Sequence, residues 1–390
     1  MKRALSIALC ALLMTACLTG AGMAEEKALN TLYSSEISTL NYLTTSTTKD
    51  FAISANVIDT LVEYDRYGNI QPSLAEKWEM SEDGLTWTFH LRRDAVWVNA
   101  KGEVQANVTA NDFVSAAKYL LDDKNASSTA DLFYGVIAGA EDYYKSTVPA
   151  AEGEAAKTPV DFETVGVKAL NEYTLQYTLA YPCAYFESMM TYVCFMPVYG
   201  PFLEEKGDRF GVADDENSIL YCGAYILSEF KPQEVRVLSK NPAYWDKDNV
   251  KIDTIRSTFN KEASSIGAEM YKRGEIDSAS IDVTTAASWL KDPETEKLIR
   301  PVRQTSFYSY FYCLNFDANF DEAYEPENWT KAVNNEAFRK SLYHGLDRVK
   351  AMLITEPDNP ESIIFNTIVP TNYATLNGVD YTLVGDLKPI

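Results

Sequence analysis

The chain has 390 residues, of which 46 % are hydrophobic and 23 % are charged, and its formal net charge is −21. This length suggests two or three domains, and the composition is typical of a folded globular protein. So large a negative charge excludes a nucleic-acid-binding surface, because nucleic-acid phosphates are bound by clustered basic residues.

The first residues resemble a secretory leader. Lys2 and Arg3 precede an apolar run from Ala4 to Met14, which is too short to span a membrane but typical of a signal-peptide core. We therefore expect an exported protein.

Two processing sites fit this leader. A signal peptide of residues 1–24 would be cut after the small residue Ala24, which leaves a periplasmic protein. Alternatively, Met14-Thr15-Ala16-Cys17 resembles a lipobox, in which residues 1–16 are removed and Cys17 is lipidated. The product would then be a cell-surface lipoprotein on the outer face of the cytoplasmic membrane.

Two segments alternate between apolar and polar residues, which indicates half-buried strands. The first is Leu85 to Arg92, and the second is Glu172 to Tyr181, which Pro182 ends. Between them a helix begins at Thr109, with Asp112 at the position of a capping box and an apolar stripe behind it.

Further elements follow in the second half of the chain. Ala150 to Lys157 reads as a surface loop, Ser264 to Gly274 as a helix with a glycine cap, and Glu275 to Asp277 as a strand. Asn335 caps a longer helix. Its apolar face consists of Phe338, Leu342, Leu346, Val349 and Leu353. The irregular order of strands and helices predicts a multi-domain mixed α/β protein.

Four cysteines follow the leader, and their spacing matches no zinc pattern. They are Cys183, Cys194, Cys222 and Cys313. A disulfide between Cys183 and Cys194, the closest pair in sequence, and four buried free thiols are both consistent with export.

The sequence contains no G-x-S-x-G, H-E-x-x-H, G-x-G-x-x-G or P-loop pattern. The two histidines, His90 and His344, are predicted on polar surfaces. Asp246, Asp248 and Asp253 lack the glycine and glutamate of an EF-hand loop, so we interpret them as a solvated turn. We expect no metal and no cofactor.

Ser306 to Phe316 reads as an aromatic strand with Tyr308, Tyr310 and Tyr312 on one face. Hydroxylated aromatics on a single face suit a partly wet ligand cleft. The alternative is a sheet face packed under a helix.

Several blocks of the sequence together resemble the extracellular solute-binding proteins of the oligopeptide and dipeptide family, family 5. The most telling is "NPAYWDKDNVKIDTI" at Asn241 to Ile255, which is similar to an N-P-x-Y-W segment of that family. The other blocks come in the family's order: "TLVEYDRYGNIQPSLAEKWEMSEDGLTWTFHLRRDAVW", "TANDFVSAAKYLLD", "YCGAYIL", "YKRGEIDSAS" and "NNEAFRKSLYHGLDR".

The resemblance implies an α/β fold of the periplasmic-binding-protein type (class II, cluster C) with two lobes and an inserted subdomain. Lobe one would comprise residues 25–70 and 198–261, and the inserted subdomain residues 71–197. Lobe two would be residues 262–390 and incomplete, because relatives continue well past this length. The chain therefore looks like a truncated member of the family.

The resemblance also implies binding without catalysis. The protein would be the monomeric substrate-binding component of an ABC importer that captures oligopeptides between its lobes and delivers them to membrane permease subunits. Contact with a membrane would come only through a lipid on Cys17. By resemblance, the ligand-facing residues are Glu36, Ile37 and Ser38 in lobe one, and Ser278, Ser280, Tyr308, Tyr310 and Tyr312 in lobe two.

Two alternatives stay open from the sequence. The same fold binds oligosaccharides, opines or metal chelates in some relatives, although the scarcity of histidine disfavours nickel. A secreted glycoside hydrolase needs only two carboxylates, which can lie anywhere in a sequence.

Overall fold

The computed structural model describes residues 27–151, 153, 155, 157–300, 311–353, 359–364, 367–369, 373, 375–376 and 379–384. It divides into two compact units, residues 1–280 and 281–390. The lobe and subdomain boundaries expected from the sequence stay predictions.

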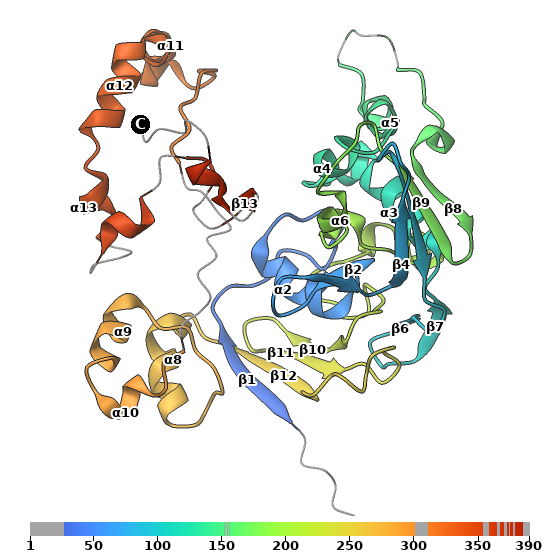
Figure 1. Cartoon of the computed structure of the whole chain (residues 1–390), viewed down its shortest axis with the longest axis horizontal. Helices are drawn as coiled ribbons and strands as arrows, with labels where there is room; N and C mark the ends of the chain where they lie inside the picture. The colour runs from blue at the N-terminus through green and yellow to red at the C-terminus, as the bar shows by residue number, and fades with distance from the viewer. Residues whose placement is uncertain are drawn as a thin grey trace, which may run out of the picture. The chain divides into compact units, whose positions relative to one another are not determined.

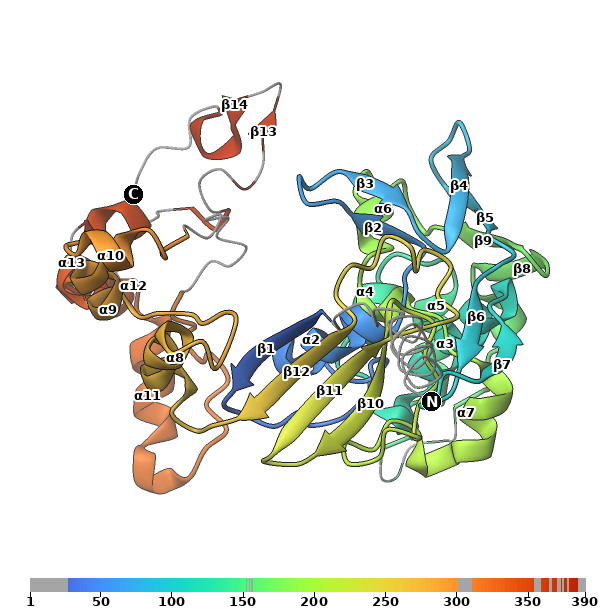
Figure 2. The same cartoon turned by 90° about the horizontal axis from the view of Figure 1, so that it is seen from below.

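A four-stranded sheet joins the two ends of the first unit (Figures 1 and 2). Its order is β1 (Ala28–Tyr33), β12 (Thr254–Phe259), β11 (Val235–Lys240) and β10 (Tyr225–Lys231). β1 pairs parallel with β12, in register from Ala28 opposite Thr254 to Tyr33 opposite Phe259, and the other pairs are antiparallel. The parallel pair requires a long connection, which here is most of the first unit.

A second, antiparallel sheet has the order β4 (Ala75–Met80), β5 (Thr86–Leu91), β9 (Thr174–Thr178) and β8 (Val167–Asn171). Both strands predicted from alternation are therefore confirmed. On β5, Trp87, Phe89 and Leu91 are buried while the residues between them are half-exposed, as the alternation requires.

The helix predicted at Thr109 is α3 (Ala110–Leu120), which packs on β8 and β9. Its capping box forms, because the backbone N–H of Thr109 donates to Asp112 Oδ2 at 2.8 Å. Trp97 Nε1 donates to the same oxygen at 2.9 Å. Burial raises the pKa of Asp112 to about 6, although these hydrogen bonds oppose the shift.

Shorter elements complete the first unit. The strands are β2 (Val62–Tyr64), β3 (Ile70–Pro72), β6 (Val96–Val98) and β7 (Val104–Asn107). The helices are α2 (Thr48–Val57), α4 (Ala130–Tyr134), α5 (Ala140–Thr147), α6 (Phe186–Met189), α7 (Gly200–Lys206) and α8 (Ala263–Lys272). The described residues of the predicted 150–157 loop lie outside any helix or strand and are mostly exposed.

The core of this unit is rich in aromatic rings. Phe133, Tyr177, Phe186 and Phe195 pack with ring centroids 5.0–6.3 Å apart, and all four are buried. Cys183, Cys194 and Cys222 are buried free thiols in the same core, and Cys313 is an exposed free thiol. The structure therefore has free thiols, and the expectation that all four are buried is wrong for Cys313.

The helix predicted at Ser264 is α8, which ends as expected before Gly274. The strand predicted at Glu275 to Asp277 is wrong. This segment is irregular because one residue, Asp277, makes its contacts with the neighbouring strand: its N–H donates to Asn30 O at 2.9 Å, and its Oδ2 accepts from Asn30 N at 2.7 Å.

The described residues of the second unit form short helices and a small strand pair. They are α9 (Val283–Trp289), α10 (Pro293–Glu296), α11 (Pro326–Asn334), α12 (Glu336–Gly345), α13 (Arg348–Met352), β13 (Thr375–Leu376) and β14 (Val379–Asp380). Across the described residues of both units, no helix is long and apolar enough to cross a bilayer.

Two sequence predictions in this unit need correction. The long helix expected after Asn335 is two helices, because Leu346 is extended and Asp347 caps a new helix by accepting from Lys350 N at 3.0 Å. The described end of the predicted aromatic strand, Phe311 to Phe316, is not a strand, and Phe311 is 71 % exposed.

Gly211 provides a test of the packing in the first unit. It has φ +71°, and a Cβ there would lie 2.4 Å from the Cα and N atoms of Asn41. Gly274 has nearly the same φ, +72°, but open space around it. We expect Gly211→Ala to lower the free energy of unfolding by about 2–4 kcal/mol and Gly274→Ala by about 1 kcal/mol, measured by urea denaturation. Equal losses of stability in the two variants would contradict the close approach of Gly211 to the backbone of Asn41.

Candidate functional site

The segment that follows β1 contains the first three predicted ligand residues, Glu36, Ile37 and Ser38. Glu36 Oε1 accepts from Tyr33 Oη at 2.8 Å and from Gln233 N at 2.7 Å. Ile37 is buried in the core. The side chains of Glu36 and Ile37 therefore fix the segment in place.

Arg236, on β11, holds the same segment from the other side. Its Nη2 donates to Ser35 O at 2.9 Å and to Glu36 Oε2 at 3.1 Å, and its guanidinium carbon lies 3.7 Å from the centroid of the Tyr33 ring. Arg236 is only 8 % exposed, so this charge is compensated mainly by Glu36.

The pKa values of this group reflect the same contacts. Burial alone would raise the pKa of Glu36, but hydrogen bonds from Gln233 N–H and the Tyr33 hydroxyl and the charge of Arg236 bring it below its usual value. Burial and the neighbouring Glu36 carboxylate raise the pKa of Tyr33 to about 12. At neutral pH the carboxylate is therefore ionised, and Tyr33 is a neutral donor to it.

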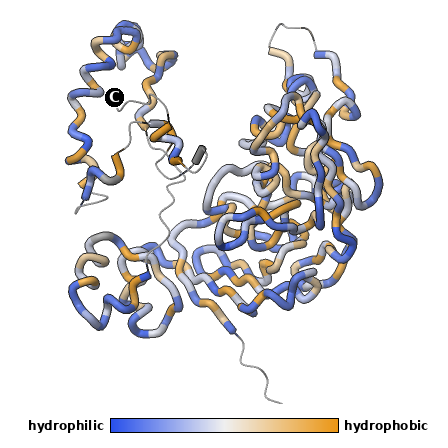
Figure 3. The backbone as a smooth tube through the Cα atoms, in the orientation of Figure 1, coloured by the Kyte–Doolittle hydropathy of each residue, from blue (hydrophilic) through white to orange (hydrophobic). Residues whose placement is uncertain are grey.

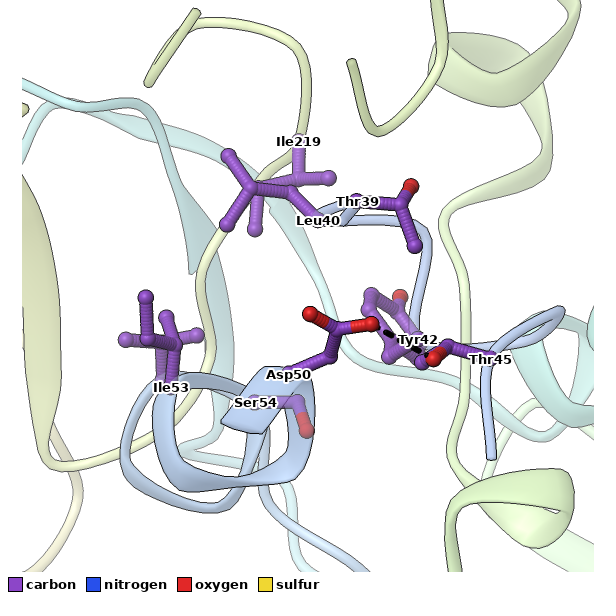
Figure 4. Close-up of a pocket in the computed structure, with 9 residues that line it drawn as sticks. Thr39, Leu40, Tyr42, Thr45, Asp50, Ile53, Ser54 and Ile219 are labelled. Atoms are coloured by element: carbon purple, nitrogen blue, oxygen red, sulfur yellow. Dashed lines mark hydrogen bonds between the residues drawn. The ribbon is translucent and has the colours of Figure 1, made fainter. Parts of the chain in front are cut away.

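Asp50, on the first turn of α2, holds the next part of the loop (Figure 4). Its carboxylate accepts from Ser38 N at 2.8 Å and from the hydroxyls of Thr45 and Thr47, both at 2.6 Å. The hollow that these residues line is filled by side chains and leaves no water-sized space. Asp50 therefore holds the loop in position, and the hollow beside it has no room for a ligand.

Some of the main chain here makes no hydrogen bond to another residue that the structure describes. No hydrogen bond joins the backbone N–H or C=O groups of Glu36, Ile37 or Ser46 to another described residue. Ser46 is also exposed, between the anchored residues Thr45 and Thr47. A rigidly held segment with unpaired backbone groups can add hydrogen bonds to an extended chain.

The second predicted segment lies beside β1. Ser278 and Ser280 are exposed and directly follow Asp277, whose backbone and side chain bind Asn30 of β1. The structure thus brings Ser278 to the edge of β1, while Glu36 to Ser38 continue from that strand's end.

The structure does not test the remaining predicted residues. Tyr308, Tyr310 and Cys17 lie outside the described residues, as do both processing sites of the leader. Tyr312 is in the second unit and is 84 % exposed, outside any strand. These assignments stay predictions.

The Asn241 to Ile255 motif builds a separate anchor in the first unit. Asn241 is buried and donates from Nδ2 to Gly223 O at 3.0 Å. Trp245 Nε1 donates to Asp59 Oδ2 at 2.8 Å, and the guanidinium carbon of Arg92 lies 3.3 Å from the Trp245 ring centroid. The Pro-aromatic-Trp corner therefore ties the end of β11 to the segment after α2.

Of the three acids predicted to form a solvated turn, Asp248 is exposed, but Asp246 and Asp253 are half-buried, and Asp253 Oδ2 accepts from Lys27 N at 3.0 Å. Asp246 accepts from Asn249 Nδ2 at 2.7 Å. His90 lies 3.4 Å from Glu79 Oε1 on a partly exposed strand face, and His344 is exposed. Within the described part of the chain, no group of three or more His, Cys, Asp or Glu side chains could hold a metal ion.

A model of the bacterial extracellular solute-binding proteins, family 5 Middle, matches residues 69–355. The chain belongs to this family. The oligopeptide-binding protein AliA of Streptococcus pneumoniae is 34 % identical over an alignment of 374 positions that covers 93 % of this chain and 54 % of AliA. The chain thus spans about half the length of such curated relatives.

Solved structures agree with the family assignment. The substrate-binding domain of an oligopeptide ABC transporter from Bacillus anthracis has a TM-score of 0.57 and 30 % identity, over 65 % of this chain and 45 % of that one. Listeria monocytogenes OppA bound to peptide has a TM-score of 0.60 and 26 % identity, over 70 % of this chain and 49 % of that one. The expected α/β solute-binding fold of family 5 is confirmed.

Asp50, Asp59 and Arg236 were missed from the sequence. For Asp50 a signal existed, since Thr47-Thr48-Lys49-Asp50 has the S/T-x-x-D spacing of a helix start. No local pattern marks the other two, because their partners are 186 and 200 positions away in the chain.

The Asp59 anchor predicts a pH dependence. Burial raises the pKa of Asp59 from 3.8 to about 7, with Glu63 adding to the shift and Trp245 opposing it. A group whose folded pKa is raised binds protons more tightly in the folded state, so its contribution to stability falls as pH rises from about 4 to about 7. We expect Asp59→Asn, which keeps an acceptor for Trp245, to remove about 1–3 kcal/mol of that fall.

The measurement is the free energy of unfolding by urea at pH 4.5, 6 and 8 for both proteins. The other acids are common to both, so the difference between the two curves isolates Asp59. Parallel curves would show that the pKa of Asp59 is ordinary.

The Arg236 anchor predicts a stability loss. Arg236→Met leaves the Glu36 carboxylate without its counter-charge and frees Ser35 O, so we expect a loss of about 1–3 kcal/mol in the free energy of unfolding. Arg236→Lys keeps the charge but not the planar contact with Tyr33, and should lose less. An unchanged denaturation midpoint for Arg236→Met would show that the contacts of Arg236 with Ser35 and Glu36 do not stabilise the protein.

Proposed function

We propose that this protein captures extracellular oligopeptides as the substrate-binding component of an ABC importer and delivers them to membrane permease subunits. The observation that carries the proposal is the segment after β1, which is fixed by Glu36, Arg236 and Asp50 yet has unpaired backbone groups. Relatives whose names describe oligopeptide binding, and a related structure bound to peptide, support the same ligand class.

The physical basis would be main-chain pairing with an extended peptide. One such hydrogen bond contributes about 0.5–1.5 kcal/mol net, whereas micromolar affinity needs about 8 kcal/mol. Glu36, Ile37 and Ser46 can supply only part of this. Ser278, Ser280 and the tyrosines at 308, 310 and 312 are the further contacts that we propose.

Because backbone groups are common to all peptides, this mode of binding favours breadth of sequence over selectivity. Side chains of the peptide would need only space and water. Closure of two lobes on the ligand would add contacts that the open form lacks. No catalytic step is part of the proposal.

The route to the outside is part of the same proposal. Residues 1–24 would act as a signal peptide, or Cys17 would be lipidated after removal of residues 1–16. The mature protein would then be a monomer, either periplasmic or anchored to the outer face of the cytoplasmic membrane. Inhibition of lipoprotein signal peptidase separates these routes, since only the Cys17 route would accumulate precursor.

The function is tested by native mass spectrometry of the purified protein and sequencing of what co-purifies. We expect a spread of adducts that release short peptides of varied sequence. A single non-peptide mass would move the function to another ligand class, and a product that forms from added substrate would indicate an enzyme.

A matched pair of variants links binding to the segment. Asp50→Ala removes the acceptor of Ser38 N, Thr45 and Thr47, and should lower peptide affinity at least about tenfold by loosening the segment. Asp83→Ala removes a comparable turn acceptor, which binds Ser81 Oγ and Leu85 N elsewhere in the first unit, and should leave affinity unchanged. Equal affinity in both variants would dissociate peptide binding from this segment.

A further inference from the structure

The first unit exposes a run of aromatic and apolar residues between β9 and the end of α6. Hydrophobic and hydrophilic residues are mixed along the strands and helices of this unit (Figure 3), and its hydrophobic residues form a core. Residues 181–185 depart from this arrangement, because only Cys183 among them is buried. We term Tyr181, Tyr185 and Tyr192, which are 46, 59 and 36 % exposed, the α6 tyrosines.

The backbone that carries these tyrosines is held in place. Glu187 Oε1 accepts from Trp78 Nε1 of β4 at 2.9 Å, which ties α6 to the second sheet. Tyr185 O accepts from Met189 N at 3.2 Å, and Met189 O accepts from Tyr192 N at 2.9 Å. Tyrosine rings on such a fixed backbone offer a large contact area at a low cost in conformational entropy.

The α6 tyrosines adjoin the segment after β1. The ring of Tyr192 packs edge-on against the ring of Phe51, with centroids 5.7 Å apart. Phe51 is the fourth residue of α2, and Ser46 precedes the N-cap of that helix. These two positions are neighbours at the start of a helix. A peptide that pairs with the backbone at Ser46 would therefore have Phe51 and Tyr192 beside it.

This surface is aromatic and uncharged. The neighbouring Cys183 thiol and Tyr181 hydroxyl raise the pKa of Tyr185, so its hydroxyl is neutral at neutral pH. Aromatic rings attract other aromatic rings at centroid distances of about 4.5–7 Å, and a tyrosine hydroxyl can also bond to a peptide backbone. A charged side chain would lose water here without gaining a counter-charge. The surface therefore suits an aromatic side chain.

We propose that Phe51 and the α6 tyrosines form a subsite for an aromatic side chain of the bound peptide. The inference rests on the proposed function and adds a preference to it. Main-chain pairing accepts many sequences, whereas this subsite would favour peptides with an aromatic residue at the position that lies beside Ser46.

Isothermal titration calorimetry with a set of nonapeptides tests the subsite. The reference peptide alternates Ala and Ser, and each further peptide carries a single Phe at one of the nine positions. We expect Phe at one or two positions to raise the affinity at least about tenfold over the reference, because its ring is removed from water. Lys at the same positions should give no such gain.

Variants show where the Phe side chain binds, and the quantity compared is the gain from Phe over the reference within each variant. Tyr192→Ala and Tyr185→Ala should each reduce the gain to less than about twofold, whereas Tyr192→Phe, which keeps the ring, should retain it. Leu170→Ala is the control and should also retain it. Leu170 is 52 % exposed on β8, at the opposite edge of the second sheet from β4.

The outcomes separate this inference from the proposed function. Binding of the reference without a favoured Phe position would overturn the subsite and leave peptide capture standing. Equal gains from Phe and Lys, or a gain that survives both alanine variants, would do the same. If no nonapeptide bound, peptide capture itself would be wrong, and the subsite with it.

Discussion

The parallel pairing of β1 with β12 is the contact on which the rest of the first unit depends. It joins residues 28–33 to residues 254–259 and thereby encloses nearly everything between them. The pair also fixes the segment that leaves β1 at Tyr33 and the edge that Asp277 occupies at Asn30. Two of the regions proposed to contact a ligand, the segment after β1 and the serines after Asp277, are thus positioned by one strand.

Around this strand pair, carboxylates bind irregular backbone. Glu36, Asp50 and Asp277 each accept at least one backbone N–H, and each connects loop residues to a strand or helix. Such bonds satisfy groups that a sheet would otherwise pair, so the loops can be ordered without being strands. A loop can bind a peptide through its main chain only if that main chain is ordered and some of its N–H and C=O groups are not already hydrogen-bonded.

The sequence predicted the local features of this fold well. Alternation located β5 and β9, and the Thr109–Asp112 spacing located α3, because these signals depend only on near neighbours. It failed where a distant partner decided the outcome. Asp277 is irregular because of Asn30, 247 positions away.

In the candidate site, too, the features that depend on distant residues were missed. Family resemblance selected the segment at Glu36, but it could not reveal that the side chain of Glu36 is engaged by Arg236. That pairing is a property of the folded sheet and leaves no trace in local spacing. The single helix predicted from Asn335 was wrong for a different reason. A stripe of apolar residues indicates which side of a helix is apolar, but it does not show whether the helical backbone continues through Leu346 and Asp347.

The separation of β1 from β12 also has a kinetic consequence. Because 226 positions lie between Thr31 and its partner Ser257, the strand pair cannot form until nearly the whole first unit has been synthesised. Closing so long a loop is slow, and contacts of high sequence separation delay folding. The second sheet and α3 can form earlier from their own nearer contacts. The amino-terminal strand would then be the last major piece to join, and until that moment the segment that follows it would have no fixed shape.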